Sequence, residues 1–510
     1  MQQELYHNAD SIPERAAIDV RAEVKEESKL KRRALAALPY LLITVAVLLA
    51  WFPAIRNYTA VADDYLDLTI MKDGWAGWYR MWGIWRIWGI PLSTWAVKAH
   101  PLAPNLLVLG AHLAAVGCFY KVCMLLLKDT WLSLILALLM GIFPWGYEAL
   151  LWSAAQFPVL AHPLFWANLI VLLNYSRKER EQQKLAFALS FLLTALCSLG
   201  SDYLIFSSMV SGVIVWIPEG KLNWSAIKRR MISHYSGWAP LLASLSYIVV
   251  WKLVSENAVK DYKAPSLNLR SILSTYYYQY TNAWIFQPWF NPATRRLIFF
   301  SWGWPQIVAA ALLLLSLIAL LIIVFSKHTL NEANAWRIKE NILTYIILLL
   351  LGGSMVYAMS GGFSLDSRKK YSLIPLILLL LGWCWRKLTP APARATSRSA
   401  VLLALLIIAG VSTTWVGIGA WRYEVARHAA LVNYLKAHRI SGEIQLESQP
   451  DLYTAWPKLQ LLIGFRMDDT WVLNNALGYH GAELVQVNQS TAATRLRFDP
   501  DRFSWEQVTR

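Results

Sequence analysis

Two adjacent carboxylates, Asp63 and Asp64, follow the first long apolar segment of the 510-residue chain. In a water-poor cleft, loss of hydration raises the pKa of one carboxyl group while its neighbour stays ionised. Such a pair can remove the proton from an alcohol, which is the work of a general base. The pair could instead brace a loop by contacting Arg56 or Arg80.

A basic cluster late in the chain could bind an anion. Arg368, Lys369 and Lys370 precede Tyr371 in the sequence GGFSLDSRKKY. On the topology expected below, this loop lies on the outer side, where short loops usually contain few basic residues. A lipid phosphate would explain the exception, because arginine binds phosphate bidentately and lysine acts as a point charge. A topology shifted by one span would instead make the cluster an ordinary cytoplasmic orientation signal.

Three more polar residues are candidate substrate contacts together with Arg56. Glu148 is the one charged residue in WGYEALLWSAAQFP, and is either a functional acid or a solvated loop residue. Asp202 lies in the short GSDY turn between two apolar segments. Burying a charge there is costly, so it should face either a cavity or a cationic partner. His162 lies near the outer end of a span, where a histidine more often packs or donates a hydrogen bond than binds a ligand.

The elements that position these residues are membrane spans. The chain is 56% hydrophobic and only 16% charged, which indicates a polytopic membrane protein, and apolar runs long enough to cross a bilayer recur along its first 420 residues. We expect about eleven all-α spans, near 34–55, 103–127, 131–147, 157–174, 185–200, 203–217, 236–254, 299–325, 341–360, 371–385 and 400–420. The segment at 203–217 could be half of a broken pair.

Basic clusters set the expected orientation. Runs at 29–33, 176–181, 227–230, 337–340 and 386–387 fall on one side, which the positive-inside rule makes cytoplasmic. The chain then divides into a cytoplasmic segment at 1–33, a transmembrane domain at 34–421 with outer loop 56–100, and an extracytoplasmic α+β domain at 422–510. Strand-like runs in that last domain include TWVLNN and ELVQVNQ.

Four tryptophans after the acid pair recur at helical spacing. Steps of three, four and three predict a stripe on one face of a short helix, with Lys72, Arg80 and Arg86 pointing away from it. Such a helix should lie flat in the membrane interface. Prolines from Pro91 onwards predict that the segment 57–100 forms two short interfacial helices. The stripe consists of Trp75, Trp78, Trp82 and Trp85.

Charge and cysteine content narrow the possible partners. The net charge of +16 suits a membrane surface or an anionic substrate, and the absence of a soluble basic domain argues against nucleic acid. All four cysteines fall inside expected spans, so the sequence predicts neither a disulfide framework nor a metal framework.

The layout resembles the GT-C superfamily of integral-membrane glycosyltransferases. The resemblance is carried by Ala62-Asp63-Asp64-Tyr65 in the first outer loop, the interfacial helices, the many spans, the basic outer loop before Tyr371 and the C-terminal domain. It implies that Asp63 is the catalytic base and that Asp64 orients the acceptor or a divalent ion. It also implies that Arg368 and Lys369 bind the donor phosphate, while Glu148 and Asp202 contact sugar hydroxyls.

The resemblance further implies a hexosyltransferase that uses a polyprenyl-phosphate sugar and inverts the anomeric carbon. Bacterial proteins of this kind work at the periplasmic face of the inner membrane, on glycan or lipid-linked acceptors such as the O-antigen of lipopolysaccharide. They depend on a cytoplasmic-side enzyme that charges the lipid and on a flippase. A Mg or Mn requirement varies across the superfamily and stays open here. The alternatives are a polysaccharide polymerase and a lipid-linked sugar flippase or transporter.

Overall fold

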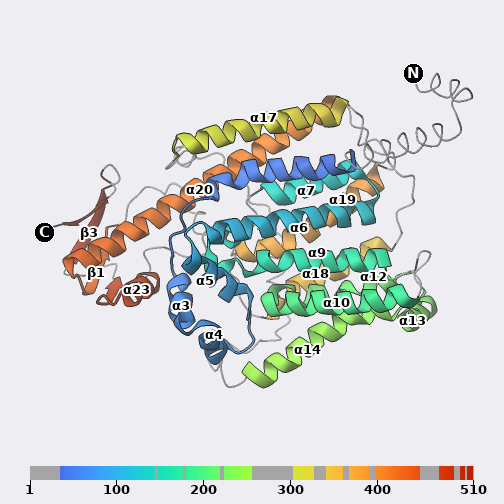
Figure 1. The fold of residues 1–510 in the computed structure, drawn as a ribbon, viewed down its shortest axis with the longest axis horizontal. Helices are drawn as coiled ribbons and strands as arrows, with labels where there is room; N and C mark the ends of the chain where they lie inside the picture. Colours follow the sequence, from blue (N-terminus) through green and yellow to red (C-terminus); the bar gives the residue numbers. More distant parts are fainter. Residues whose placement is uncertain are drawn as a thin grey trace, which may run out of the picture.

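A computed structural model of the chain consists of a helical bundle with a small sheet at one end (Figure 1). It describes residues 35–143, 147–175, 180–218, 223–255, 302–326, 341–359, 367–389, 397–447, 470–487, 494–499, 502 and 504–508. The basic run at 29–33 and the segment 256–301 lie outside these residues.

All eleven expected apolar segments contain helix. Within the described residues, eight helices are long and apolar enough to cross a membrane. These are Leu35–Ala54, Ala103–Leu127, Ser153–Tyr175, Arg180–Gly200, Tyr235–Val254, Trp304–Ile323, Tyr371–Leu388 and Val401–His438. The remaining three apolar helices are shorter, namely Thr130–Ile142, Asp202–Trp216 and Ile342–Gly353. The class of fold expected from the sequence, an all-α polytopic protein with a small α+β unit, is therefore confirmed.

The named elements of the bundle follow the chain order. The helix Leu35–Ala54 closes with the 3-10 turn η2 (Phe52–Ala54). After the first loop come α6 (Ala103–Leu127), α7 (Thr130–Ile142), α8 (Tyr147–Leu151), η4 (Ser153–Ala155), α9 (Phe157–Tyr175), α10 (Arg180–Gly200), η5 (Asp202–Leu204), α11 (Ile205–Ser211), α12 (Val213–Trp216), α13 (Trp224–Ser233), η6 (Tyr235–Gly237), α14 (Trp238–Ser255), α17 (Trp304–Ser326), α18 (Ile342–Met359), α19 (Ser367–Leu388) and α20 (Ser397–His438).

The long helices of the first half of the chain pack side by side in the bundle. Helix α6 lies against α7 and α9, α9 against α10, and α10 against α14. The turn between α6 and α7 is only Lys128 and Asp129, with Lys128 in the left-handed region (φ 55°). The Asp129 carboxylate caps α7 by accepting a hydrogen bond from the backbone N–H of Leu132 (2.9 Å). Deep in the bundle, Trp51 donates to the carbonyl of Gly141 (2.8 Å) and so joins the first helix to α7.

The first loop folds differently from the expectation of two helices. It contains three helices, α3 (Asp63–Ile70), α4 (Gly74–Trp82) and α5 (Gly89–Ala99), with the short turn η3 (Met71–Asp73) between the first two. Gly83 at φ 61° ends α4, so Trp85 and Arg86 do not continue the helical stripe. Pro91 does not break a helix here, because it lies in the first turn of α5, where its missing N–H is tolerated.

Helix α20 joins the bundle to the C-terminal unit. Its 42 residues span about 63 Å at 1.5 Å per residue, roughly twice the thickness of a bilayer's hydrocarbon core. The helix therefore runs out of the bundle and into the C-terminal unit (Figure 1). Residue 421, where the sequence analysis placed the end of the transmembrane domain, lies within this helix.

The C-terminal unit, called the cap below, consists of a four-stranded sheet and α23 (Thr470–Tyr479). Strand β1 (Gly442–Leu446) pairs in parallel with β2 (Val485–Val487) and with β3 (Thr494–Asp499), and β3 pairs antiparallel with β4 (Ser504–Val508). The strand expected at ELVQVNQ is β2. The prediction of a strand at TWVLNN is wrong, because this run forms the start of α23. The helix is favoured because its apolar residues form one buried face, made of Val472, Leu473, Ala476 and Leu477.

The core of the cap extends into the first loop. Leu431 and Leu435 of α20, Leu473 of α23 and Ile444 of β1 pack together with Tyr65 of α3. The ring of Tyr65 lies 5.4 Å from the ring of Tyr479, measured between centroids. The helix that begins with the acid pair is therefore part of the cap's hydrophobic core.

The shared core predicts that damage to the cap reaches α3. Leu473→Ala removes a fully buried side chain and should destabilise the cap by about 2–5 kcal/mol. Amide hydrogen exchange in α3 should accelerate together with exchange in the cap. Leu484→Ala is the matched control, because Leu484 is 56% exposed. Unchanged protection of α3 in the Leu473→Ala variant would show that the two are not coupled.

Candidate active site

Asp64 is buried in the first turn of α3, where it is 2% exposed. Its Oδ2 atom accepts hydrogen bonds from the Tyr58 hydroxyl (2.5 Å) and from the backbone N–H of Val61 (2.9 Å). Its Oδ1 atom accepts from the backbone N–H of Ala154 (2.8 Å), which is 90 residues away in η4. The carboxylate therefore joins the first loop to the segment that precedes α9.

Tyr58 strengthens the same connection. Its hydroxyl donates to Asp64 and accepts a hydrogen bond from the backbone N–H of Ser153 (2.7 Å). Burial raises the pKa of the Tyr58 hydroxyl well above its ordinary value, and the negative charge of Asp64 raises it further. Tyr58 is consequently a neutral donor that holds one oxygen of Asp64 in place.

Burial also controls the protonation of Asp64. Loss of hydration raises the pKa of Asp64 to about 7, against the opposing effect of its three hydrogen bonds from Tyr58, Val61 and Ala154. The negative charge of Asp63 raises the pKa further. Asp64 therefore changes its charge near neutral pH, while both of its oxygens are occupied by donors.

Two more carboxylates lie on the same helix. Asp63 is half-buried, and Asp67, one turn later, is only 7% exposed. Residues four apart share a helix face, so Asp63 and Asp67 lie one above the other. Burial raises the pKa of Asp67 well above its ordinary value, the charges of Asp64 and Asp63 add to this, and Arg86 opposes it.

Sequence reasoning missed Asp67. The spacing of Asp63 and Asp67 was the available signal, because four residues place two acids on one helix face. Among the described residues, the Asp67 side chain has no hydrogen-bond partner. The acid pair expected from the sequence is therefore a group of three carboxylates, called the acid cluster below.

Asp202 has a cationic partner. Arg86 donates from Nε to Oδ1 (2.8 Å) and from Nη2 to Oδ2 (3.1 Å), which is a bidentate pair. The guanidinium lies between the rings of Trp85 (3.9 Å) and Phe157 (3.7 Å). The prediction that Arg86 points away from the tryptophans is wrong, because Gly83 ends α4 and the chain turns Arg86 inward, where it is 8% exposed.

His162 and Tyr371 make their contacts inside the bundle. The Tyr371 hydroxyl lies 2.7 Å from Nδ1 of His112, whose Nε2 lies 3.0 Å from the carbonyl oxygen of Gly141. His162 uses Nδ1 to contact the carbonyl of Pro158 (2.6 Å), and its ring packs edge-on against Tyr371 with 4.7 Å between centroids. Both side chains are buried, His162 completely.

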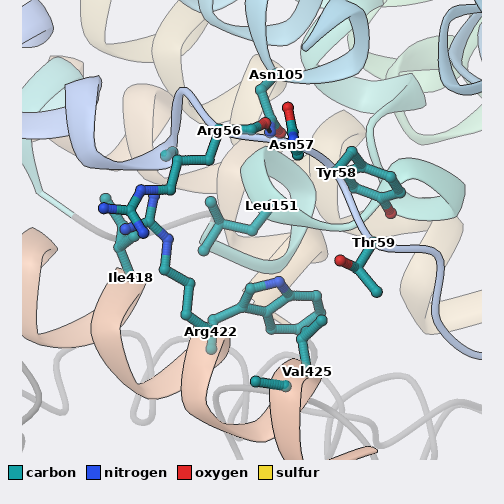
Figure 2. A pocket seen from close by; sticks show the side chains of 12 residues that line it. Arg56, Asn57, Tyr58, Thr59, Asn105, Leu151, Ile418, Arg422 and Val425 are labelled. Carbon is teal, nitrogen blue, oxygen red and sulfur yellow. Dashed lines mark hydrogen bonds between the residues drawn. The ribbon is translucent and has the colours of Figure 1, made fainter. Parts of the chain in front are cut away.

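Arg56 lines a pocket of about 290 Å³ at the end of the bundle nearest the cap. Residues 56–59, Asn105 at the start of α6, and Trp421 and Arg422 of α20 form its walls. The Asn105 side chain donates to the carbonyl of Arg56 (2.8 Å) and holds that turn. Figure 2 shows Arg56 and Arg422 reaching towards the same part of the pocket from opposite elements.

The pocket, called the arginine pocket below, adjoins the acid cluster. Tyr58 lines the pocket and also donates its hydroxyl proton to Asp64. Tyr58 therefore connects the wall of the arginine pocket to the buried Asp64 carboxylate. Arg422 was not among the residues expected from the sequence, since a single arginine just after a span usually marks only the interface.

Four predicted residues have no described side chain. Glu148 belongs to α8, and Arg368, Lys369 and Lys370 belong to the first turn of α19, but their side chains lie outside the described residues. The start of α19 is near the first loop, because Leu373 packs in one cluster with Met71 and Ile90. Among the described residues, no three His, Cys, Asp or Glu side chains are grouped as metal ligands.

Comparisons with known proteins give a distant structural likeness. No protein-family model matches the chain, and no curated protein sequence matches it. The fold is similar to the crystal structure of ArnT from Cupriavidus metallidurans in the apo state, with 12% identity and a TM-score of 0.37 over 92% of this chain and 94% of that one. It is similar to the same protein bound to undecaprenyl phosphate, with 11% identity and a TM-score of 0.37 over 91% and 93% of the two chains.

The raised pKa of Asp64 predicts a pH-dependent stability. Between pH 3.8, the ordinary pKa, and about 7, the folded protein holds a proton that the unfolded chain has lost. The stabilisation is complete below the lower value and is lost as the pH rises to about 7, at a limiting slope of about 1.4 kcal/mol per pH unit. Asp64→Asn removes this titration and leaves that of Asp67.

The measurement is thermal unfolding of both proteins in detergent from pH 4.5 to 8.5. The stability of the wild-type protein relative to Asp64→Asn should fall up to about pH 7 and then level off. A difference that stays constant below pH 7 would show that Asp64 does not titrate there.

Proposed function

We propose that this protein is a membrane glycosyltransferase that moves a sugar from a polyprenyl-phosphate donor to a glycan or lipid-linked acceptor. The observation that carries the proposal is the shared wall between the acid cluster and the arginine pocket. Transfer needs a base for the acceptor hydroxyl and cations for the leaving phosphate. Both kinds of group lie at the cap end of the bundle.

Asp63 is the proposed general base. It is the more accessible member of the acid pair, whereas both oxygens of Asp64 are occupied by donors. Asp63 takes the proton of the acceptor hydroxyl, and the hydroxyl oxygen bonds to the anomeric carbon of the donor sugar. The bond from that carbon to the phosphate oxygen breaks, and its electron pair leaves with the polyprenyl phosphate. One displacement of this kind inverts the anomeric carbon.

Asp64 is proposed as a positioning residue. Its hydrogen bonds to Val61 and Ala154 set the start of α3 against η4, so they fix the direction in which Asp63 projects. A positioned base is more effective because orientation is already present when the substrate binds. The burial and raised pKa of Asp64 also limit the negative charge next to a phosphate-bearing donor.

The reaction is assigned to the extracytoplasmic face of a bacterial inner membrane. Nucleotide sugars are absent there, so the sugar must arrive on a lipid that another enzyme has charged on the cytoplasmic side. The support for this side is the distribution of basic runs in the sequence, which makes the N-terminus cytoplasmic and the cap extracytoplasmic.

Asp63→Asn tests the base directly. Purified protein in vesicles is given a polyprenyl-phosphate donor with a radiolabelled sugar, together with a membrane extract as acceptor source. The variant should fold normally and lose transfer by about a hundredfold or more, as expected for loss of a general base. Asp73→Asn is the matched control, because Asp73 is an exposed acid in the same loop, paired with Arg80, and its loss should leave transfer unchanged.

The same vesicles separate the competing functions. Full transfer by Asp63→Asn would remove Asp63 from the mechanism. A labelled lipid that crosses the bilayer and keeps its sugar would instead identify a flippase. A labelled product of many repeated units would identify a polymerase.

A further inference from the structure

The guanidinium end of Arg422 is buried and makes no hydrogen bond to the residues that the structure describes. Its Nη1 and Nη2 atoms are both shielded from solvent. A buried charge left uncompensated is strongly destabilising, so proteins normally pair it. The nearest acid along α20, Glu424, is engaged in a buried ion pair with Arg427 (2.9 Å).

The surroundings of Arg422 add positive charge instead of compensating it. Arg56 lines the same pocket, and the two positive charges repel each other. None of the described residues that line the pocket is acidic. Two guanidinium groups that line one cavity, with no carboxylate among its described lining residues, form a site that attracts an anion. Figure 2 shows the side chains of Arg56 and Arg422 converging from two different elements.

The shape of the pocket favours a phosphate group attached to an apolar chain. Arginine offers donors in a planar fork that matches phosphate oxygens. Asn57 and Thr59 add polar groups to the wall that follows the first helix, whereas Leu151, Ile418 and Val425 form an apolar wall opposite. At about 290 Å³ the cavity holds far more than a water molecule, whose share of liquid volume is about 30 Å³.

We infer that Arg56 and Arg422 together bind the phosphate of a prenyl-phosphate lipid in the arginine pocket. The presence of an anion site follows from the pocket alone, whereas the role of that lipid as sugar donor rests on the proposed function. The site differs from the basic run at 368–370, which the sequence suggested for the phosphate. Tyr58, which lines the same pocket and donates its hydroxyl proton to Asp64, connects the site to the acid cluster.

Binding of defined ligands to the purified full-length protein in nanodiscs tests the inference. The ligands are ³²P-labelled farnesyl phosphate and ³²P-labelled inorganic phosphate. Unlabelled farnesol serves as an uncharged competitor. Farnesyl phosphate should bind the wild-type protein, and Arg422→Gln should weaken that binding by about tenfold or more, because it removes a charge-assisted bidentate contact. Arg422→Lys should retain part of the affinity.

Arg80→Gln is the matched control. It removes one arginine from an exposed ion pair in the first loop and should leave the affinity for farnesyl phosphate unchanged. Without ligand, Arg422→Gln should melt at the same temperature as the wild-type protein or higher, because it removes an uncompensated charge. A lower melting temperature would show that Arg422 is paired in the fold, and this would overturn the inference.

The two ligands distinguish the source of the phosphate. Preferential binding of farnesyl phosphate supports a lipid site. Equal binding of inorganic phosphate, lost in Arg422→Gln, keeps the anion site but removes the lipid from it. Binding of neither ligand, or equal binding to Arg422→Gln, overturns the inference. Because none of these readouts requires sugar transfer, the site can hold even if the transferase proposal fails.

Discussion

The burial of the Asp64 carboxylate constrains the whole cap end of the molecule. A carboxylate removed from water is tolerated only when donors replace its hydration. Here three donors do so, and they come from Tyr58, Val61 and Ala154. The backbone between them is held so firmly that Ala62, directly before the acid pair, adopts a positive φ of 49°, which a non-glycine residue rarely does.

Helix α20 supports both parts of the proposed site, the arginine pocket and the acid cluster. It contributes Arg422 to the arginine pocket, and about two and a half to three and a half turns later it contributes Leu431 and Leu435 to the core of the cap. The cap core also holds Tyr65 of α3, so the same helix supports the acid cluster from the other side. Sites built on helices keep their geometry better than sites built on loops, which suits a reaction between a lipid donor and a second substrate.

The sequence predicted those features that depend on local pattern. Apolar run length located the eleven helical segments, and Asp63 and Asp64 were recognised by their position after the first of them. The distant partners of Asp64 and Tyr58 could not be predicted, because Ala154 and Ser153 contribute backbone N–H groups that carry no sequence signal. The expectations for Arg86 and for the TWVLNN run failed where Gly83 and tertiary packing overrode the local periodicity.

A cryo-electron microscopy structure with a polyprenyl-phosphate sugar bound in nanodiscs tests the central claim most directly. The account predicts the phosphate between Arg56 and Arg422, the anomeric carbon facing Asp63, and Asp64 still bonded to Tyr58 and Ala154. A phosphate bound only by Arg368, Lys369 and Lys370, with the arginine pocket empty, would contradict it. So would a sugar on the far side of the bundle from α3.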